Sequence, residues 1–175
     1  MMETVLNVGM TPEVAEAMSR VLREEFGNPS SVYAEGAAAR SVVEAARRQV
    51  AGLLGVKSTE VRFTGGATEA NNTLLFGLLR PGDHVVTTAI EHPSVAEPLS
   101  LLETRGVSVT RIVPDSDGCV SAEGIEGAIR EDTKLVTVIW ANNETGALQP
   151  IEEIADICRR RDLVFHVDAT QAVGK

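Results

Sequence analysis

The sequence is poor in several features that would mark a particular class of protein. Aromatic residues make up 3% of its 175 residues, and it has two cysteines. No stretch approaches the roughly 20 apolar residues that a membrane-spanning helix needs, so we expect no membrane span. Acidic residues outnumber basic ones by 25 to 16, which gives a net charge of −9. Because polyanions are bound by clustered Lys and Arg side chains, we expect no nucleic acid partner.

The two cysteines are far apart in the sequence and show no pattern typical of a metal or redox site. Cys119 and Cys158 lie outside any CxxC motif or Cys/His cluster. We therefore expect two reduced structural thiols and no metal ion. A secretory signal has a basic region followed by an apolar core, and the first residues of this sequence show no such pattern. The sequence thus predicts a cytoplasmic protein.

Short apolar runs alternate with helix-like segments along most of the chain. Helices are expected at 11–25 and at 35–54, where Gly55 ends the second. Runs rich in Val and Ile predict buried strands at 60–64, 84–89, 107–113, 135–141 and 163–167. The segments 68–79, 94–105, 121–130 and 151–161 are long enough to cross between parallel strands. This pattern predicts an α/β fold with a mostly parallel sheet flanked by helices.

Polar loops follow several of these predicted strands, at the edge where open α/β sheets bind ligands. In the loop 64–72, glycines after a strand and the start of a helix are suited to a phosphate group. The loop lacks the lysine of a P-loop and does not match GxGxxG, so nucleotide binding is the weaker interpretation. By itself, the loop could also be only a tight turn and a helix cap.

Asp168 follows an apolar strand, which predicts a carboxylate in a partly dry place. Because an unpaired buried carboxylate is costly, we expect a cationic partner, and a protonated pyridinium nitrogen is one. His92, after another strand, could stack on a flat cofactor, although a lone histidine is more often structural. The alternative, that the loops are only turns, does not explain why these side chains and Asn143 and Gln171 gather at one sheet edge.

Five motifs of the sequence, in their order and spacing, resemble those of the cysteine desulfurases. They are FGNPSS at 26–31, GATEANN at 66–72, EH at 91–92, NNETG at 142–146 and HVDATQ at 166–171. The wider class V aminotransferases share the fold and fewer of these motifs. The resemblance covers nearly the whole chain. It implies a segment 1–33 with a helix and loop, followed by part of the large domain of a pyridoxal-phosphate-dependent transferase at 34–175.

The resemblance implies that one group of residues holds the phosphate and ring of pyridoxal 5′-phosphate. Ala67 and Thr68 would bind the phosphate. His92 would stack on the ring and could exchange a proton.

Three further residues are implied to contact the polar atoms of the ring. Asn143 and Gln171 would approach the phenolic oxygen, which amide donors suit. Asp168 would pair with the ring nitrogen and keep it protonated.

The activity implied by the resemblance is the conversion of L-cysteine to L-alanine, with the sulfur left on an enzyme cysteine as a persulfide. A sulfur-acceptor protein of iron–sulfur cluster or thio-cofactor assembly would then receive it. The resemblance also implies a homodimer, or a complementing C-terminal chain.

Some residues of the family pattern have no counterpart in this sequence. The Schiff-base lysine follows a Ser-x-His motif well beyond the strand with Asp168, and Lys175 is not that lysine. The persulfide cysteine and the substrate-binding arginine also lie further on, and residues 6–10 depart from the family pattern. We therefore expect a fragment or split half that is inactive alone. The alternatives are a related class V enzyme, such as a selenocysteine lyase, and a non-catalytic binding or assembly protein.

Overall fold

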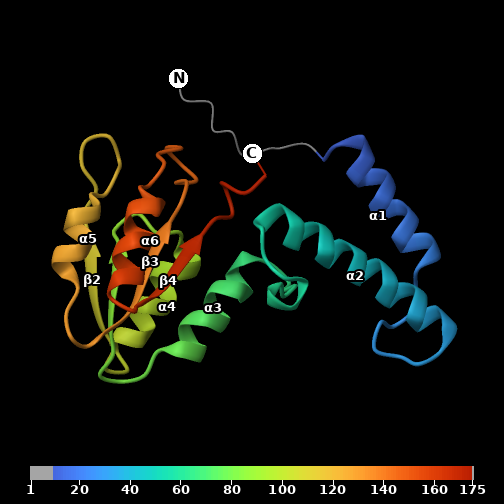
Figure 1. Cartoon of the computed structure of the whole chain (residues 1–175), viewed down its shortest axis with the longest axis horizontal. Coiled ribbons are helices and arrows are strands. Elements are labelled where there is room, and N and C mark those ends of the chain that lie inside the picture. The colour runs from blue at the N-terminus through green and yellow to red at the C-terminus, as the bar shows by residue number, and fades with distance from the viewer. Residues whose placement is uncertain (1–9, 175) are drawn as a thin grey trace. The chain divides into compact units, whose positions relative to one another are not determined.

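The computed structural model describes residues 10–174, and its first elements are two helices (Figure 1). Helix α1 (Pro12–Glu24) begins after Thr11, whose side chain accepts a hydrogen bond from the Val14 amide. Helix α2 (Ala34–Leu54) ends at Gly55, which has a φ of 68°, a conformation that glycine adopts without strain. Both predicted helices are confirmed. Among the described residues, no helix is long and apolar enough to cross a membrane.

The chain divides into two units between Phe63 and Thr64. The boundary expected after residue 33 falls between α1 and α2, inside the first unit. Residues 6–9, where the sequence departs from the family pattern, and Lys175 lie outside the described residues.

The second unit contains the predicted parallel sheet. Its strands are β1 (His84–Thr88), β2 (Ser108–Ile112), β3 (Thr133–Ile139) and β4 (Val164–Asp168), and their order is β2-β1-β3-β4 with every pair parallel. The helices between and before them are α3 (Ala67–Leu78), α4 (Pro93–Glu103), α5 (Ala122–Ala128) and α6 (Ile151–Arg160). The predicted fold class and four of the predicted strands are confirmed.

The strand predicted at 60–64 is wrong. Residues Ser58–Glu60 form a short 3-10 helix, η1, and the residues after it pair with no strand among those described. The apolar alternation there reflects the burial of Val61, whose carbonyl accepts a hydrogen bond from Arg47 Nη1 of α2 at 2.7 Å.

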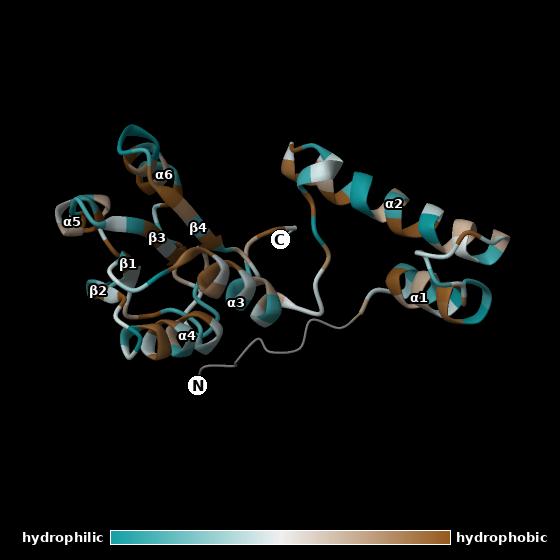
Figure 2. Ribbon diagram, turned by 90° about the horizontal axis from the view of Figure 1, so that it is seen from below, coloured by the Kyte–Doolittle hydropathy of each residue, from teal (hydrophilic) through white to brown (hydrophobic). Residues whose placement is uncertain are grey.

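The two faces of the sheet are covered by different helix pairs (Figure 2). On one face, α3 and α4 pack over a buried cluster that includes Val85 and Leu135. On the other, α5 and α6 pack over a cluster that includes Val86 and Val136. Neighbouring residues of a strand point to opposite faces, so these near-continuous apolar runs are explained by burial on both sides.

The strand order creates a switch point between β1 and β3. The chain leaves β1 toward β2 on one side, then returns to add β3 and β4 on the other. The loops after β1 and β3 therefore run in opposite directions, and ligands in open α/β sheets bind in the crevice that results.

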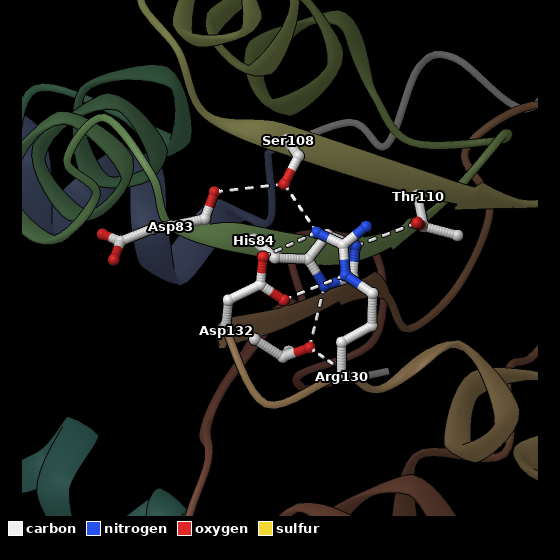
Figure 3. Close-up of polar contacts among 7 residues, drawn as sticks. Asp83, His84, Ser108, Thr110, Arg130 and Asp132 are labelled. Atoms are coloured by element: carbon white, nitrogen blue, oxygen red, sulfur yellow. Dashed lines mark hydrogen bonds and ion pairs between the residues drawn. The ribbon is translucent and has the colours of Figure 1, made fainter.

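A buried histidine joins three strands at the opposite, amino edge of the sheet (Figure 3). His84 is fully buried, and its Nδ1 lies 2.8 Å from Thr133 Oγ1 while its Nε2 lies 2.9 Å from Thr110 Oγ1. Burial lowers the pKa of His84, and the charge of Arg130 lowers it further, while Asp132 opposes this. His84 is therefore a neutral ring between two hydroxyl groups.

This arrangement predicts a loss of stability in acid that depends on His84. The unfolded chain binds the proton at the ordinary pKa of 6.5 and the folded protein only at a lower pH. The stabilising effect is thus complete above pH 6.5 and is lost as the pH falls through the folded value. In His84→Gln, the free energy of unfolding should decline less between about pH 7 and about pH 5 than in the wild type. Chemical denaturation at each pH measures this, and equal declines would contradict it.

Candidate functional site

The carboxyl edge of the sheet brings together residues from several elements of the second unit. Asp168 is the last residue of β4, and Glu91 and His92 lie in the short loop between β1 and α4. The loop after β3 contains Asn143, and α3 begins with Ala67 and Thr68. Gln171 lies in the turn that follows β4.

Asp168 is a buried carboxylate held by hydrogen bonds on both of its oxygens. Its side chain is 6% exposed. Asn71 Nδ2 donates to Oδ2 at 2.9 Å, and Thr170 donates to Oδ1 from its hydroxyl at 2.6 Å and from its amide at 3.1 Å. Burial raises the pKa of Asp168, but the hydrogen bonds from Thr170 and Asn71 outweigh it, so the pKa is below its ordinary value.

The charge on Asp168 has no Lys or Arg partner within the part of the chain that the structure describes. His166, on the same strand, is mostly kept neutral, because burial lowers its pKa and the charge of Asp168 only partly offsets this. An ionised carboxylate in such a place favours a cationic ligand.

A chain of hydrogen bonds leads from Asp168 to His92 through two residues that sequence analysis did not single out. The amide nitrogen of Asn71 also donates to Ser94 Oγ at 2.9 Å, and Ser94 Oγ lies 2.8 Å from His92 Nδ1. Asn71 and Ser94 are both buried. The sequence contained one indication of the burial of Asn71, because Asn71 lies four residues before Leu75 and so on the same, buried face of α3.

The structure places Thr68 and His92 on the wall of one hollow between α3 and α4. The cavity volume is about 630 Å³. Its lining comprises Thr68, Asn72, Phe76, His92, Pro93, Ser94, Glu97, Pro98 and Leu101. Asn143, Asp168 and Gln171 are not part of this lining.

The start of α3 presents backbone amides that no side chain caps. Gly66 precedes the helix, and Ala67 and Thr68 at its start are exposed. The loop before it is held by Glu69, whose Oε2 accepts a hydrogen bond from the Gly65 amide at 2.6 Å. Open first-turn amides and the helix dipole favour an anion such as phosphate.

The loop after β3 is organised by Asn142, the neighbour of the predicted Asn143. Asn142 Oδ1 accepts hydrogen bonds from the amides of Glu144 and Thr145, and its Nδ2 donates to the Ile90 carbonyl at 3.2 Å. Asn142 therefore ties the loops after β3 and β1 together. Asn143 itself is half-buried and Gln171 is exposed, and their roles toward a cofactor stay predictions.

Glu91 is a second buried carboxyl group, and it bridges β1 and β3 at the switch point. Its side chain is 9% exposed. Oε1 accepts hydrogen bonds from Thr88 Oγ1 at 2.6 Å and from the Ile139 amide at 2.9 Å. Oε2 is buried and has no hydrogen-bond partner among residues 10–174. In the sequence, the only indication that Glu91 belongs to the site is its position next to His92.

The two carboxyl groups at this edge differ in their preferred state. Burial raises the pKa of Glu91 to about 7, and the hydrogen bonds from Thr88 and Ile139 oppose the rise while the charge of Asp168 adds to it. Asp168, with donors on both oxygens, stays ionised. Of these two buried carboxyl groups, Asp168 is therefore the one that carries a negative charge at mildly acid pH.

We predict that Glu91→Gln stabilises the protein at alkaline pH. The folded pKa of Glu91 is about 7 and its ordinary value is 4.5. The contribution of Glu91 to the free energy of unfolding is therefore fully present below pH 4.5 and is lost as the pH rises through 7. The difference above pH 7 is on the order of 3 kcal/mol. Glutamine keeps an oxygen for Thr88 and Ile139 and has no charge to bury.

Denaturant unfolding of both proteins at about pH 5 and about pH 8.5 measures this difference. Glu97→Gln, on α4, is the control for a change of net charge. An equal shift in both variants, or none in Glu91→Gln, would show that Glu91 has no special cost of ionisation.

Comparison with known proteins places this chain in a family. The model of the aminotransferase class-V family matches residues 9–175. A cysteine desulfurase IscS of Dictyoglomus turgidum is 42% identical over 166 residues, which are 93% of this chain and 42% of that protein. A NifS/IcsS protein homolog of Lactobacillus delbrueckii subsp. bulgaricus is 43% identical over 171 residues, 95% of this chain and 44% of that protein.

Solved structures agree with the sequence matches. SspA in complex with cysteine superposes with a TM-score of 0.88 at 37% identity, over 93% of this chain and 48% of that one. DndA from Streptomyces lividans gives a TM-score of 0.85 at 37% identity, over 98% of this chain and 51% of that one. The chain thus spans less than half the length of these curated relatives and about half of these solved chains. Since the family model covers nearly all of its residues, the chain belongs to the class V aminotransferase family.

Proposed function

We propose that this chain is the cofactor-binding part of a pyridoxal-phosphate-dependent cysteine desulfurase. The observation that supports the proposal most directly is the ionised, buried Asp168, with donors on both carboxylate oxygens and no Lys or Arg partner among the described residues. The names of the relatives support the reaction type, since those of the sequence relatives include cysteine desulfurase IscS.

The residues present fit pyridoxal 5′-phosphate at three of its chemical groups. Asp168 suits a protonated ring nitrogen, because it supplies a negative charge in a dry place. The open amides at Ala67 and Thr68 suit the phosphate. The exposed ring of His92, on the wall shared with Thr68, suits stacking.

When bound, the cofactor supplies an electron sink for the bonds broken around the substrate's α-carbon. The part that this chain plays is to bind and orient it. Asp168 would hold a proton on the ring nitrogen, while Asn71 and Thr170 keep the carboxylate ionised and in place. Asn143 and Gln171 would donate to the phenolic oxygen.

The proposed substrate is L-cysteine, with L-alanine as product and the sulfur passed through a persulfide to an acceptor protein. One structural neighbour, SspA, was solved in complex with cysteine. By family resemblance, the Schiff-base lysine and the persulfide cysteine belong to the part of the relatives that this chain does not span. The proposal therefore includes a C-terminal part, and a homodimer as the assembled form.

A cytoplasmic setting belongs to the same proposal. Both Cys119 and Cys158 are free thiols, and burial raises the pKa of Cys158 to about 11. Free thiols suit a reducing compartment.

We predict that Asp168→Asn weakens the binding of pyridoxal 5′-phosphate by roughly tenfold to a hundredfold, the effect of losing a charged hydrogen bond. Asparagine has nearly the same shape and lacks the charge. Equilibrium dialysis, with absorbance of the bound cofactor, measures the affinity. Asp162→Asn is the matched control, because Asp162 lies in an exposed turn just before β4. Equal affinities of wild type and Asp168→Asn would overturn the cofactor assignment.

The reaction is tested by adding the C-terminal part of a relative. The chain is mixed with, or fused at its end to, the C-terminal part of the Dictyoglomus turgidum relative, and alanine release from L-cysteine is measured. Activity that depends on both parts and on Asp168 supports cysteine desulfuration. Cofactor binding without alanine release in any combination would point to a different class V reaction.

A further inference from the structure

Ser94 lies between the ring of His92 and the side-chain amide of Asn71, and it is hydrogen-bonded to both. Ser94 contacts His92 Nδ1 twice, through its amide nitrogen at 3.1 Å and through its hydroxyl at 2.8 Å. His92 is the residue that caps α4, with this ring nitrogen as the acceptor. The contacts therefore connect the ring to the start of a helix and to the buried polar chain behind it.

The direction of these hydrogen bonds follows from the atoms involved. A backbone N–H can only donate, so His92 Nδ1 must accept from Ser94 and cannot hold a proton itself. In the neutral imidazole, one nitrogen donates and the other accepts. The proton of a neutral His92 therefore lies on Nε2.

The unprotonated Nδ1 also fixes the direction of the Ser94 hydroxyl, because that nitrogen can only accept the hydroxyl proton. The amide nitrogen of Asn71 has two N–H groups, and one is held by the carboxylate of Asp168, which can only accept. The other N–H points to Ser94 Oγ and occupies one of the two lone pairs of the hydroxyl. The hydroxyl proton is left for His92 Nδ1. The Ser94 amide and hydroxyl thus share His92 Nδ1 as their acceptor, and Asn71 donates to Ser94 and to Asp168.

The opposite ring nitrogen is the one available for a ligand. His92 is exposed and lines the hollow beside Thr68. Its Nε2 has no hydrogen-bond partner within residues 10–174. An N–H at that position would offer a hydrogen-bond donor to an acceptor atom bound in the hollow.

We propose that Ser94 and Asn71 are positioning residues, which hold His92 as the Nε2–H tautomer and so present an N–H donor to the ligand. The identity of that ligand as cofactor or substrate rests on the proposed function, but the tautomer does not. The ligand class is one with an oxygen or sulfur acceptor near the ring of His92. Ser94 and Asn71 act through the ring of His92.

The test measures the tautomer directly in the 175-residue chain without cofactor. Long-range ¹H–¹⁵N correlation spectra distinguish the two imidazole nitrogens, and the chain has three histidines, so His92→Gln assigns the signals. We expect the wild type to show a protonated Nε2 and an accepting Nδ1. In Ser94→Ala, the ratio of Nε2–H to Nδ1–H tautomer should fall roughly threefold to tenfold, the effect of one neutral hydrogen bond.

Three variants separate positioning from a general effect on folding. Ser94→Thr keeps the hydroxyl and should keep the wild-type ratio. Ser100→Ala, on the exposed side of the same helix, should also leave it unchanged. The signals of His84 and His166 report whether each variant is folded, and Ser94→Cys, with its weaker donor, replaces Ser94→Ala if the latter is not.

The outcomes distinguish this inference from the proposed function. A proton on Nδ1 in the wild type, or equal ratios in wild type and Ser94→Ala, would overturn the positioning role. The expected tautomer in a chain that binds no pyridoxal 5′-phosphate would leave the positioning role standing and reject the cofactor instead.

Discussion

The buried negative charge of Asp168 is the constraint on which the carboxyl edge of the sheet depends. A carboxylate at 6% exposure is costly unless donors surround it. Here, the donors come from α3, through Asn71, and from the turn after β4, through Thr170. The hydrogen bonds to this one carboxylate therefore fix the positions of α3 and of the turn after β4 relative to β4.

The same requirement extends to the neighbouring loops. The second N–H of the Asn71 side chain donates to Ser94, and Ser94 in turn fixes the ring of His92 at the start of α4. Polar groups linked in this way polarise one another, so such a chain is stiffer than its separate bonds. Glu91 connects β1 to β3 in a different way, as a carboxyl group whose burial favours the neutral form. Of the two carboxyl groups at this edge, one is thus ionised and the other is neutral, because only Asp168 has donors on both oxygens.

Much of this arrangement could be predicted from the sequence, because its periodicity reports burial. The runs that became β1 and β3 are buried along nearly their whole length, and polar residues follow where the strands end. The prediction failed at 60–64, where burial of Val61 against α2 gives the same local pattern as a strand. Local pattern does not show whether a partner strand exists.

Only part of the site could be predicted, because the sequence pattern shows where strands end and does not show which distant residues meet. His92 and Asp168 stand in motifs that directly follow strands, so their place at the edge was visible. Asn71 and Ser94 lie inside helices, where a polar residue usually faces solvent, and their role depends on contacts between residues 23 and 97 positions apart. Glu91 was visible only as a neighbour of His92. Such pairings arise from the fold and cannot be seen in spacing alone.

The central claim is that Asp168 is ionised in its buried position while Glu91 beside it stays protonated until near neutral pH. A titration of the side-chain carboxyl groups by ¹³C NMR, with Asp168→Asn and Glu91→Gln to assign the signals, measures both groups in one experiment. The account predicts a midpoint for Asp168 below its ordinary value of 3.8 and a midpoint for Glu91 of about 7. A midpoint for Asp168 near neutral pH would mean that the edge holds no fixed negative charge, and would contradict the account.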